Sequence, residues 1–337
     1  MKAVVLNETG GPENLVIEEV ATPEPAAGEV RVKLKTSALN RRDYWITIGK
    51  YPGVSCPSIG GSDGAGVIDA VGEGGDESVI GREVVVYPAR DWGELEHKYH
   101  PDFRVLGMPD QGTFAEYICV PADDVYDKPA HLDWEQAAAI PLAGLTAWRA
   151  LVTHAEIKAG HKVLVTGAGS GVSTFAMQWA LGHGAEVYVT SGSEEKIEKA
   201  RALGANGGAN YREQDFCKQL REMSGGFDVI IDSAAGNTFN AILDTLNHAG
   251  RFVFFGATMG NPPEGLEIAK LFFRHIRIQG TMMGSPREFA AMMKFVNEKK
   301  IEPLVHQAYA MEDAVTAHKL MENFSQMGKI VLRNEVT

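Results

Sequence analysis

Residues 162–190 read KVLVTGAGSGVSTFAMQWALGHGAEVYVT, and this stretch decides the fold of the second half of the chain. An apolar run leads into a turn of small residues at 167–171, then into a segment with helical apolar spacing, then into a second β-rich run. Strand, tight turn, helix and strand is the order of a nucleotide-binding βαβ unit. Such a turn lets the backbone approach a pyrophosphate, and the helix start offers unpaired N–H groups to the anion. We expect Gly169, Ser170, Gly171 and Val172 to bind a dinucleotide.

The glycine fingerprint of this turn is imperfect. The pattern G-x-G-x-x-G fails, because Gly167 and Gly169 are followed by Ser170, Gly171 and Val172. We expect Ser173 to replace the glycine that packs the helix against the strand. A tight strand-to-helix connection without a ligand remains the alternative for this turn.

The alternation of strands and helices continues beyond this unit. Six strands with helices between them predict a parallel, doubly wound sheet. The expected strands are 163–166, 186–190, 207–211, 228–232, 251–255 and 276–280. The expected helices are 171–183, 194–203, 213–223, 236–247 and 264–274, with an amphipathic helix at 286–300 and a broken helical segment at 134–151.

The first part of the chain has a different texture. Short apolar runs separated by Gly and Pro predict a barrel-like, β-rich domain. These runs are 3–6, 15–20, 29–36, 66–71, 83–87 and 113–120. We expect the last strand, 329–332, to return to this domain. The expected domains are therefore 1–125 with 295–337, and 126–294.

Composition excludes several functional classes. The net charge of −12 argues against a nucleic-acid partner or an anionic membrane surface, since both require basic patches. The start MKAVVLNETGG has no apolar signal core, and no apolar run approaches a membrane span. Cys56, Cys119 and Cys217 are far apart and predict buried or half-buried free thiols. We expect a cytoplasmic protein.

A series of short motifs resembles the medium-chain dehydrogenase/reductase superfamily, and within it the zinc-free quinone oxidoreductase group. The resemblance covers essentially the whole chain. The motifs are MKAVV (1–5) with GGPE (10–13), ALNRRD (38–43) with GKYP (49–52), GGSDGAG (60–66), GTFAEY (112–117), LTAW (145–148), QGTMMG (279–284) and GKIVL (328–332).

This resemblance implies a GroES-like, barrel-like domain plus a Rossmann domain. It implies an NADPH-dependent reductase that transfers a hydride to a quinone or an α,β-unsaturated carbonyl compound, and a homodimer formed along the edge strand near 276–280. The protein supplies binding and orientation, while the hydride chemistry belongs to the nicotinamide. The alternatives are a zinc-type alcohol dehydrogenase and a non-enzymatic NADPH-binding protein.

The residues do not predict a metal site. Zinc-dependent relatives place Cys-His at the position of Asn40-Arg41 and His-Glu at the position of Ser62-Asp63. A catalytic zinc needs three protein ligands, and this chain has lost the sulfur and imidazole donors there. The structural zinc lobe needs four clustered cysteines, and the chain has three dispersed ones. His97 and His100, in the segment 91–104, are expected to lie in a solvated loop.

The end of the second strand favours NADPH. NAD enzymes carry an acid there for the adenosine ribose, but this strand ends in Thr190, Ser191, Gly192 and Ser193. The acids that follow are expected to stabilise a helix start. The phosphate site of the family matches Gly192, Lys196 and Tyr211, and Lys196 is alternatively a solvated helix lysine.

Asn40, Tyr44 and Tyr51 are the candidate catalytic residues. Asn40 matches the family residue near the nicotinamide ribose and is alternatively a cap residue. The two tyrosines could donate to a substrate oxygen, with barrel packing as the alternative. We expect these three residues to face the nicotinamide. The residues expected to hold the nicotinamide are Asn40, Thr146, Phe255, Gly256, Ala257, Met282, Met283 and Gly284.

Overall fold

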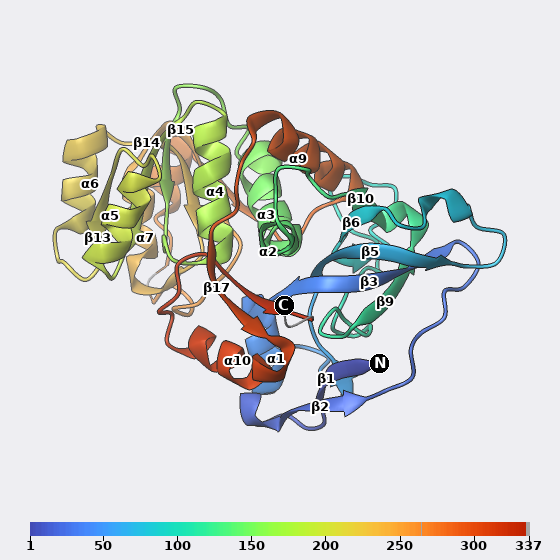
Figure 1. Ribbon diagram of the computed structural model, residues 1–337. Coiled ribbons are helices and arrows are strands. Elements are labelled where there is room, and N and C mark those ends of the chain that lie inside the picture. The colour runs from blue at the N-terminus through green and yellow to red at the C-terminus, as the bar shows by residue number, and fades with distance from the viewer. Residues whose placement is uncertain (264, 335–337) are drawn as a thin grey trace. The chain divides into compact units, whose positions relative to one another are not determined.

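The computed structural model describes residues 1–263 and 265–334 (Figure 1). The chain divides into two compact units. The first unit comprises Met1–Ala143 and Ser285–Thr337, and the second comprises Gly144–Gly284. Among the described residues, no helix is long and apolar enough to cross a membrane.

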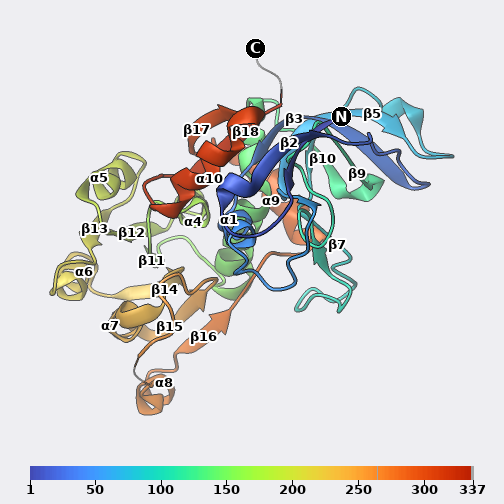
Figure 2. The same cartoon turned by 90° about the horizontal axis from the view of Figure 1, so that it is seen from below.

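The second unit is built on a parallel six-stranded sheet, which confirms the predicted fold class. The strand order is β13-β12-β11-β14-β15-β16, so the order reverses between β11 and β14. Figure 2 shows the strands in this order. The central residues of β11 and β14 are fully buried, as is typical of a parallel sheet covered on both faces. The strands are β11 (Lys162–Val165), β12 (Glu186–Ser191), β13 (Gly207–Asn210), β14 (Phe227–Asp232), β15 (Leu246–Phe254) and β16 (Arg277–Gly280).

Helices connect these strands, as the alternation predicted. A π-helical segment, Arg149–His154, precedes the sheet. Residue 264, where the last of these helices was expected to begin, lies outside the described residues. The helices are α4 (Gly171–Gly182), α5 (Glu194–Ala202), α6 (Phe216–Ser224), α7 (Phe239–Asp244) and α8 (Ile268–Phe273).

The first unit is mainly antiparallel β-sheet, as its short apolar runs predicted. Its largest sheet has the order β10-β6-β5-β3-β18-β17, with β9 also paired to β3. The last strand, β18, pairs antiparallel with β3, so the chain returns to this unit as expected. A three-stranded sheet, β2-β1-β4, and the pair β7-β8 complete the strands. The strands are β1 (Lys2–Leu6), β2 (Leu15–Glu19), β3 (Glu29–Ala38), β4 (Ser58–Ile59), β5 (Asp63–Val71), β6 (Glu83–Val86), β7 (Ala89–Arg90), β8 (Arg104–Val105), β9 (Tyr117–Pro121), β10 (Val125–Asp127), β17 (Val305–Ala310) and β18 (Lys329–Arg333).

The unit boundaries differ from those placed on the sequence. The helix α2 (Trp134–Ala139) packs on β3 and β5, so the segment after residue 125 stays with the first unit. The chain passes from the first unit to the second within the helix α3 (Pro141–Trp148). The chain returns to the first unit at Ser285. There Tyr126 Oη donates to Pro286 O at 3.2 Å, and this hydrogen bond holds the start of α9 (Pro286–Lys299) to β10. Local packing therefore sets both boundaries, and composition does not record it.

One expectation about the cysteines is wrong. All three thiols are free, but Cys56 is exposed, while Cys119 and Cys217 are half-buried. Cys56 lies in the turn-rich stretch between α1 (Arg41–Thr47) and β4, and connecting segments of this kind run over the protein surface.

A buried histidine lies in the core of the first unit. His318, on α10 (Ala314–Glu322), is 1% exposed. Its Nδ1 donates to Ala314 O at 2.7 Å. Its ring contacts the ring of Phe114 edge-on, with the two ring centroids 5.6 Å apart. Burial lowers the pKa of His318 to about 4, because a charged imidazole cannot be hydrated there.

This histidine predicts a specific loss of stability in acid. The folded-state pKa lies below the unfolded value, so stability is complete above the unfolded pKa and is lost as pH falls toward the folded pKa. Between pH 7 and pH 4.5 the loss should be about 2–3 kcal/mol. His318→Asn keeps an N–H donor for Ala314 O but does not titrate, so its free energy of unfolding should fall by that much less. Urea unfolding at both pH values measures the difference, and equal losses in both proteins would contradict the assignment.

Candidate active site

The residues predicted to bind the cofactor lie at one edge of the parallel sheet. The turn at 167–170 follows β11, Ser191 ends β12, and Tyr211 follows β13. Residues 255–257 follow β15, and residues 282–284 come after β16. Because the strands are parallel, all their carboxyl ends share this edge, which is where open α/β sheets bind ligands. Thr146 is buried on α3 of the same unit.

The turn after β11 has the local structure that close approach of a phosphate needs. Gly167 has a φ of 68°, which favours glycine. Ser170 caps α4, since its Oγ accepts from the backbone N–H of Ser173 at 3.1 Å. Ser173 Oγ in turn donates to Thr166 O at 2.8 Å. The fully buried Ser173 thus ties the helix to the strand end in place of the missing glycine.

The loop after β12 presents hydroxyl groups. Ser191 Oγ accepts from the backbone N–H of Ser193 at 3.2 Å, and Ser193 caps the start of α5. The two glutamates that follow are engaged by neighbours. Glu194 accepts from Asn210 Nδ2 at 2.9 Å, and Glu195 pairs with Lys199 at 2.7 Å.

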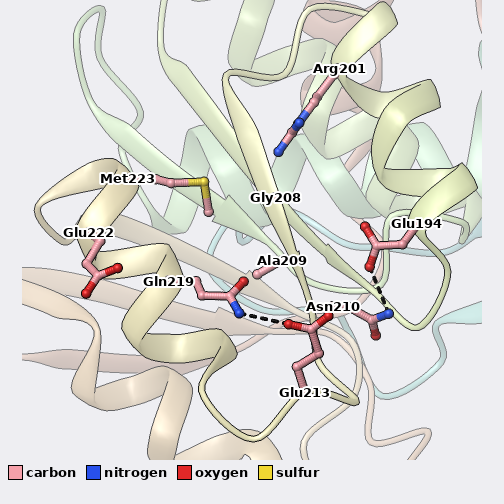
Figure 3. A pocket seen from close by; sticks show the side chains of 9 residues that line it. All are labelled: Glu194, Arg201, Gly208, Ala209, Asn210, Glu213, Gln219, Glu222 and Met223. Carbon is pink, nitrogen blue, oxygen red and sulfur yellow. Dashed lines mark hydrogen bonds between the residues drawn. The ribbon is translucent and has the colours of Figure 1, made fainter.

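Figure 3 shows where Glu194 points. With Asn210 it lines an open pocket over β13, between α5 and α6. Glu213 and Gln219 of the same pocket are joined by a hydrogen bond of 2.8 Å. The pocket contains none of the residues predicted for the cofactor, so we do not assign the cofactor to it.

Gly192 allows two polar side chains to lie against the loop. A Cβ atom at this position would lie 2.7 Å from Tyr211 Oη and 2.9 Å from Arg212 Nε. Lys196 is half-buried nearby on the first turn of α5, and burial lowers its pKa. Sequence reasoning passed over Arg212 as a candidate, although its position directly after Tyr211 is a signal.

Asn40 is held in a buried network of charged side chains in the first unit. Lys329 Nζ donates to Asn40 Oδ1 at 2.7 Å and to Asp63 Oδ2 at 2.8 Å. Asn40 Nδ2 donates to the same Asp63 Oδ2 at 2.9 Å. The side chain of Lys329 is 3% exposed and that of Asp63 is fully buried. A buried carboxylate and ammonium require this kind of pairing, since either charge alone would be costly.

The network continues into the first turn of α1. The backbone N–H of Asn40, the residue before the helix, donates to Asp43 Oδ2 at 2.7 Å. Burial raises the pKa of Asp43 to about 6, although the charge of Arg42 and this N–H both oppose the increase. Asp43 therefore orders the helix start.

Arg42 connects this network to Tyr51. Its guanidinium donates to Ser62 Oγ at 2.7 Å and to the carbonyls of Leu106 and Met108 at 2.8 and 2.9 Å. It also lies over the Tyr51 ring, 4.9 Å from the centroid. The structure thus places the half-buried Tyr51 on a fixed cation.

Tyr44 has a different environment. It is 9% exposed in the core of the first unit and contacts Trp45 edge-on. Its hydroxyl interacts with Glu322, and burial together with that carboxylate raises its pKa. Of the two tyrosine candidates, Tyr51 is the less buried.

The side chains at the former zinc positions do not fit a zinc ion. Asn40 and Asp63 already bind Lys329, and Ser62 Oγ donates to Leu106 O at 2.8 Å. Arg41 donates to Met321 O and lies 4.0 Å from the centroid of the Phe324 ring. Across residues 1–263 and 265–334, no group of three or more His, Cys, Asp or Glu side chains is placed to hold a metal ion.

An aromatic cluster occupies the segment where zinc-dependent relatives have their structural lobe. Trp92 is buried and contacts the rings of Tyr99 and Phe103 edge-on, with distances between ring centroids of 6.1 and 5.3 Å. His97 and His100 are exposed, as expected for a solvated loop. Apolar packing of these rings therefore holds the segment together.

Sequence reasoning missed Lys329, Asp63 and Arg42 as site residues. Lys329 is part of the motif GKIVL and is the first residue of β18. A lysine that opens an otherwise apolar strand is a signal of buried charge, since such a strand has no solvated face to receive it. Asp63 gives a similar signal, because it opens β5 directly after a run of small residues.

Comparisons with known proteins agree with this architecture. Residues 26–130 match the family model for the alcohol dehydrogenase GroES-like domain, and residues 171–298 match that for zinc-binding dehydrogenase. The chain is 34% identical to the zinc-type alcohol dehydrogenase-like protein YogA of Leptosphaeria maculans, over 94% of each chain. It is 30% identical to a quinone oxidoreductase of Salmonella typhimurium, over 98% of each chain.

A solved structure has the same fold. The crystal structure of an NAD-dependent alcohol dehydrogenase superposes with a TM-score of 0.93, at 38% identity, covering 99% of this chain and 100% of the other. With the two matched domains and these full-length relatives, the chain belongs to the medium-chain dehydrogenase/reductase superfamily, a superfamily of oxidoreductases.

Proposed function

We propose that this chain is an NADPH-dependent reductase that transfers a hydride to a quinone or an α,β-unsaturated carbonyl compound without zinc. The closed network of Asn40, Asp63 and Lys329 carries the proposal. In this network, the side chains at the positions of the zinc ligands of zinc-dependent members are already engaged in hydrogen bonds with one another and with Lys329. The names of the quinone oxidoreductase relatives support the acceptor class.

The chemistry divides between the cofactor and the chain. NADPH, when bound, supplies the hydride. The chain must hold the acceptor and donate a hydrogen bond to the oxygen where negative charge develops. Tyr51 and the side-chain amide of Asn40 are the candidate donors. Because the described residues form no metal-ligand group that would polarise an isolated ketone, a conjugated acceptor that spreads the charge is the easier substrate.

The hydroxyl of Tyr51 gives the first prediction of this proposal. Tyr51→Phe keeps the ring on Arg42 and removes only the hydroxyl, so kcat should fall by about tenfold, or ~1.4 kcal/mol. Steady-state NADPH oxidation with a quinone measures it. Tyr117→Phe is the matched control, because Tyr117 also lies under an arginine, at 5.4 Å. An unchanged kcat in Tyr51→Phe removes Tyr51 from the mechanism, and Tyr44→Phe then tests the other tyrosine.

The preference for NADPH is the next part of the proposal. Ser191 and Ser193 can donate to a 2′-phosphate, Lys196 lies one turn on, and Glu194 and Glu195 are engaged elsewhere. The solved relative named as NAD-dependent shows that the superfamily also uses NAD. The residues of this loop favour NADPH, since an acid that would repel the phosphate is missing from the strand end.

Lys196→Ala should weaken NADPH binding and leave NADH binding nearly unchanged. A charge-assisted hydrogen bond to the 2′-phosphate contributes ~1–3 kcal/mol, so the wild type should bind NADPH at least about tenfold more tightly than NADH. Titration calorimetry measures both dissociation constants. Lys199→Ala, on the same helix but paired with Glu195, is the control. Equal affinity of the wild type for both cofactors would disprove the preference.

Metal independence is tested directly by chelation. Overnight treatment with a strong chelator should change neither the melting temperature nor the rate of quinone reduction, because no group of ligands within residues 1–263 and 265–334 couples a metal to folding. Elemental analysis of the purified protein accompanies the assay. Stoichiometric zinc that is lost together with activity would show that the network residues have been misassigned.

A second copy of this chain is the proposed partner. The strand β16 ends the sheet, and most of its residues are exposed. The adjacent helix α8 exposes Ile268, Phe272 and Phe273, with Phe273 71% exposed. An unpaired strand edge beside exposed aromatic rings is a liability that proteins usually cover. Joining two sheets edge to edge would cover both features at once.

Light scattering should therefore find a homodimer at micromolar concentration. Phe272→Asp with Phe273→Asp places charge in the apolar patch and should shift the protein toward monomer without unfolding it. The exposed Leu203→Asp, on the other side of the sheet, is the control and should stay dimeric. A monomeric wild type would refute the assembly.

A screen of acceptors tests the reaction itself. NADPH oxidation is followed with quinones, enones and aldehydes, and ethanol oxidation is followed with NADP+. Turnover of quinones or enones above that of ethanol is expected. Efficient alcohol oxidation without quinone or enone turnover would instead favour the alcohol dehydrogenase activity named for several relatives. Tight NADPH binding without any turnover would favour a non-enzymatic role.

A further inference from the structure

We propose that Lys329 is a positioning residue, which fixes the side-chain amide of Asn40 so that one amide N–H is presented for the reaction. Only the identity of the group that this N–H contacts rests on the proposed function. The positioning itself rests on the contacts of Lys329, Asn40 and Asp63.

Donor and acceptor chemistry allows one orientation of the Asn40 amide. An ammonium group can only donate and a carboxylate can only accept. The atom facing Lys329 at 2.7 Å must therefore be Oδ1, and the atom facing Asp63 at 2.9 Å must be Nδ2. Turning the amide over would set an N–H against the ammonium and an oxygen against the carboxylate. The second N–H of Nδ2 accordingly points away from both charges.

The two charges are held on strands, whereas Asn40 begins a helix. Asp63 opens β5, and its Oδ1 accepts from the backbone N–H of Leu142 at 2.8 Å. Lys329 opens β18, and its own backbone N–H donates to Leu304 O at 2.9 Å. Both side chains are almost completely buried. The pair therefore forms a rigid support, of the kind that a precisely placed side chain requires.

Stability alone does not account for this ion pair. A buried pair recovers little more than its desolvation cost, and well-packed apolar residues often serve as well. A buried pair is best explained where it selects one arrangement among several. The Asn amide torsion is broad and roughly two-fold, so without the charges both amide orientations would be populated. Lys329 removes that choice.

A double-mutant cycle tests the positioning role. Lys329→Met and Asn40→Ala should each lower kcat/KM for a quinone by about tenfold or more, the loss expected for a hydrogen bond made in the transition state. If Lys329 acts through Asn40, the double variant should be no slower than Asn40→Ala alone. Losses that multiply would overturn the proposal, because Lys329 would then act independently of Asn40.

The control variant is Lys128→Met. Lys128 is also a mostly buried lysine of the first unit, with a side chain 8% exposed, an ion pair to Glu83 and a contact with the Trp134 ring. It makes none of the contacts of the Asn40 network. Lys128→Met should lower the melting temperature and leave kcat/KM unchanged. If kcat/KM fell as much in Lys128→Met as in Lys329→Met, general destabilisation would explain both losses.

A second variant tests the positioning role if Lys329→Met does not fold. Lys329→Met alone leaves the Asp63 carboxylate buried without its cation, which is strongly destabilising. Lys329→Met with Asp63→Asn removes both charges and should fold. The new amide keeps its oxygen on the Leu142 N–H and therefore turns its NH2 group toward Asn40. The kcat/KM of this variant should still fall by about tenfold, because the Asn40 amide then turns its oxygen toward the new NH2 group and no longer presents the same N–H. Wild-type kcat/KM in this variant would overturn the proposal.

A measurement without turnover separates this proposal from the proposed function. A buried, hydrogen-bonded ammonium exchanges slowly with water and gives a proton–nitrogen NMR correlation. That signal should be absent in Lys329→Met, shifted in Asn40→Ala and unchanged in Lys128→Met. A signal that does not move in Asn40→Ala overturns the contact. If the signal behaves as expected but no acceptor is reduced, the proposed function fails and the positioning stands.

Discussion

The buried ion pair between Lys329 and Asp63 is the interaction on which the first unit depends most. It joins the last strand of the chain to β5, and through Asp63 Oδ1 it also holds the backbone of Leu142. Through Asn40 it reaches the first turn of α1. Segments far apart in the sequence are thus tied to one pair of charges. Neither charge could remain buried if the other were removed, because the desolvation cost would be unpaid.

The regular architecture was largely predictable. Five of the six strands of the parallel sheet lie within one residue of their expected bounds, because buried strands such as β11 and β14 are continuous apolar runs. The sixth, β15, begins at Leu246 and not at 251, because its first residues are mainly polar or small and form no apolar run. The strand β18 returned to the first unit as expected. The unit boundaries could not be placed in this way. They depend on the packing of α2 on β3 and β5, and contacts between distant segments leave no local pattern.

The candidate site was predictable only where a backbone motif carries it. Residues 169–172 follow β11, and residues 191–193 lie at the end of β12, so their position at the sheet edge is predicted by the alternation alone. The side-chain network of Lys329, Asp63 and Arg42 was missed, since its members come from three distant segments. Sequence patterns record which residues are present but not which of them meet. Tyr44 shows the same limit, because its ring packs in the core while its hydroxyl interacts with the exposed Glu322.

We expect conjugation in the substrate to stabilise the developing negative charge that a metal ion stabilises in zinc-dependent relatives. The most direct test compares 2-cyclohexen-1-one with cyclohexanone as acceptors for chelator-treated protein and NADPH, because the two differ only in the conjugated double bond. We expect kcat/KM for the enone to exceed that for the saturated ketone by at least about a hundredfold, or ~2.7 kcal/mol. Comparable values for both ketones, or reduction of cyclohexanone that requires added zinc, would contradict it.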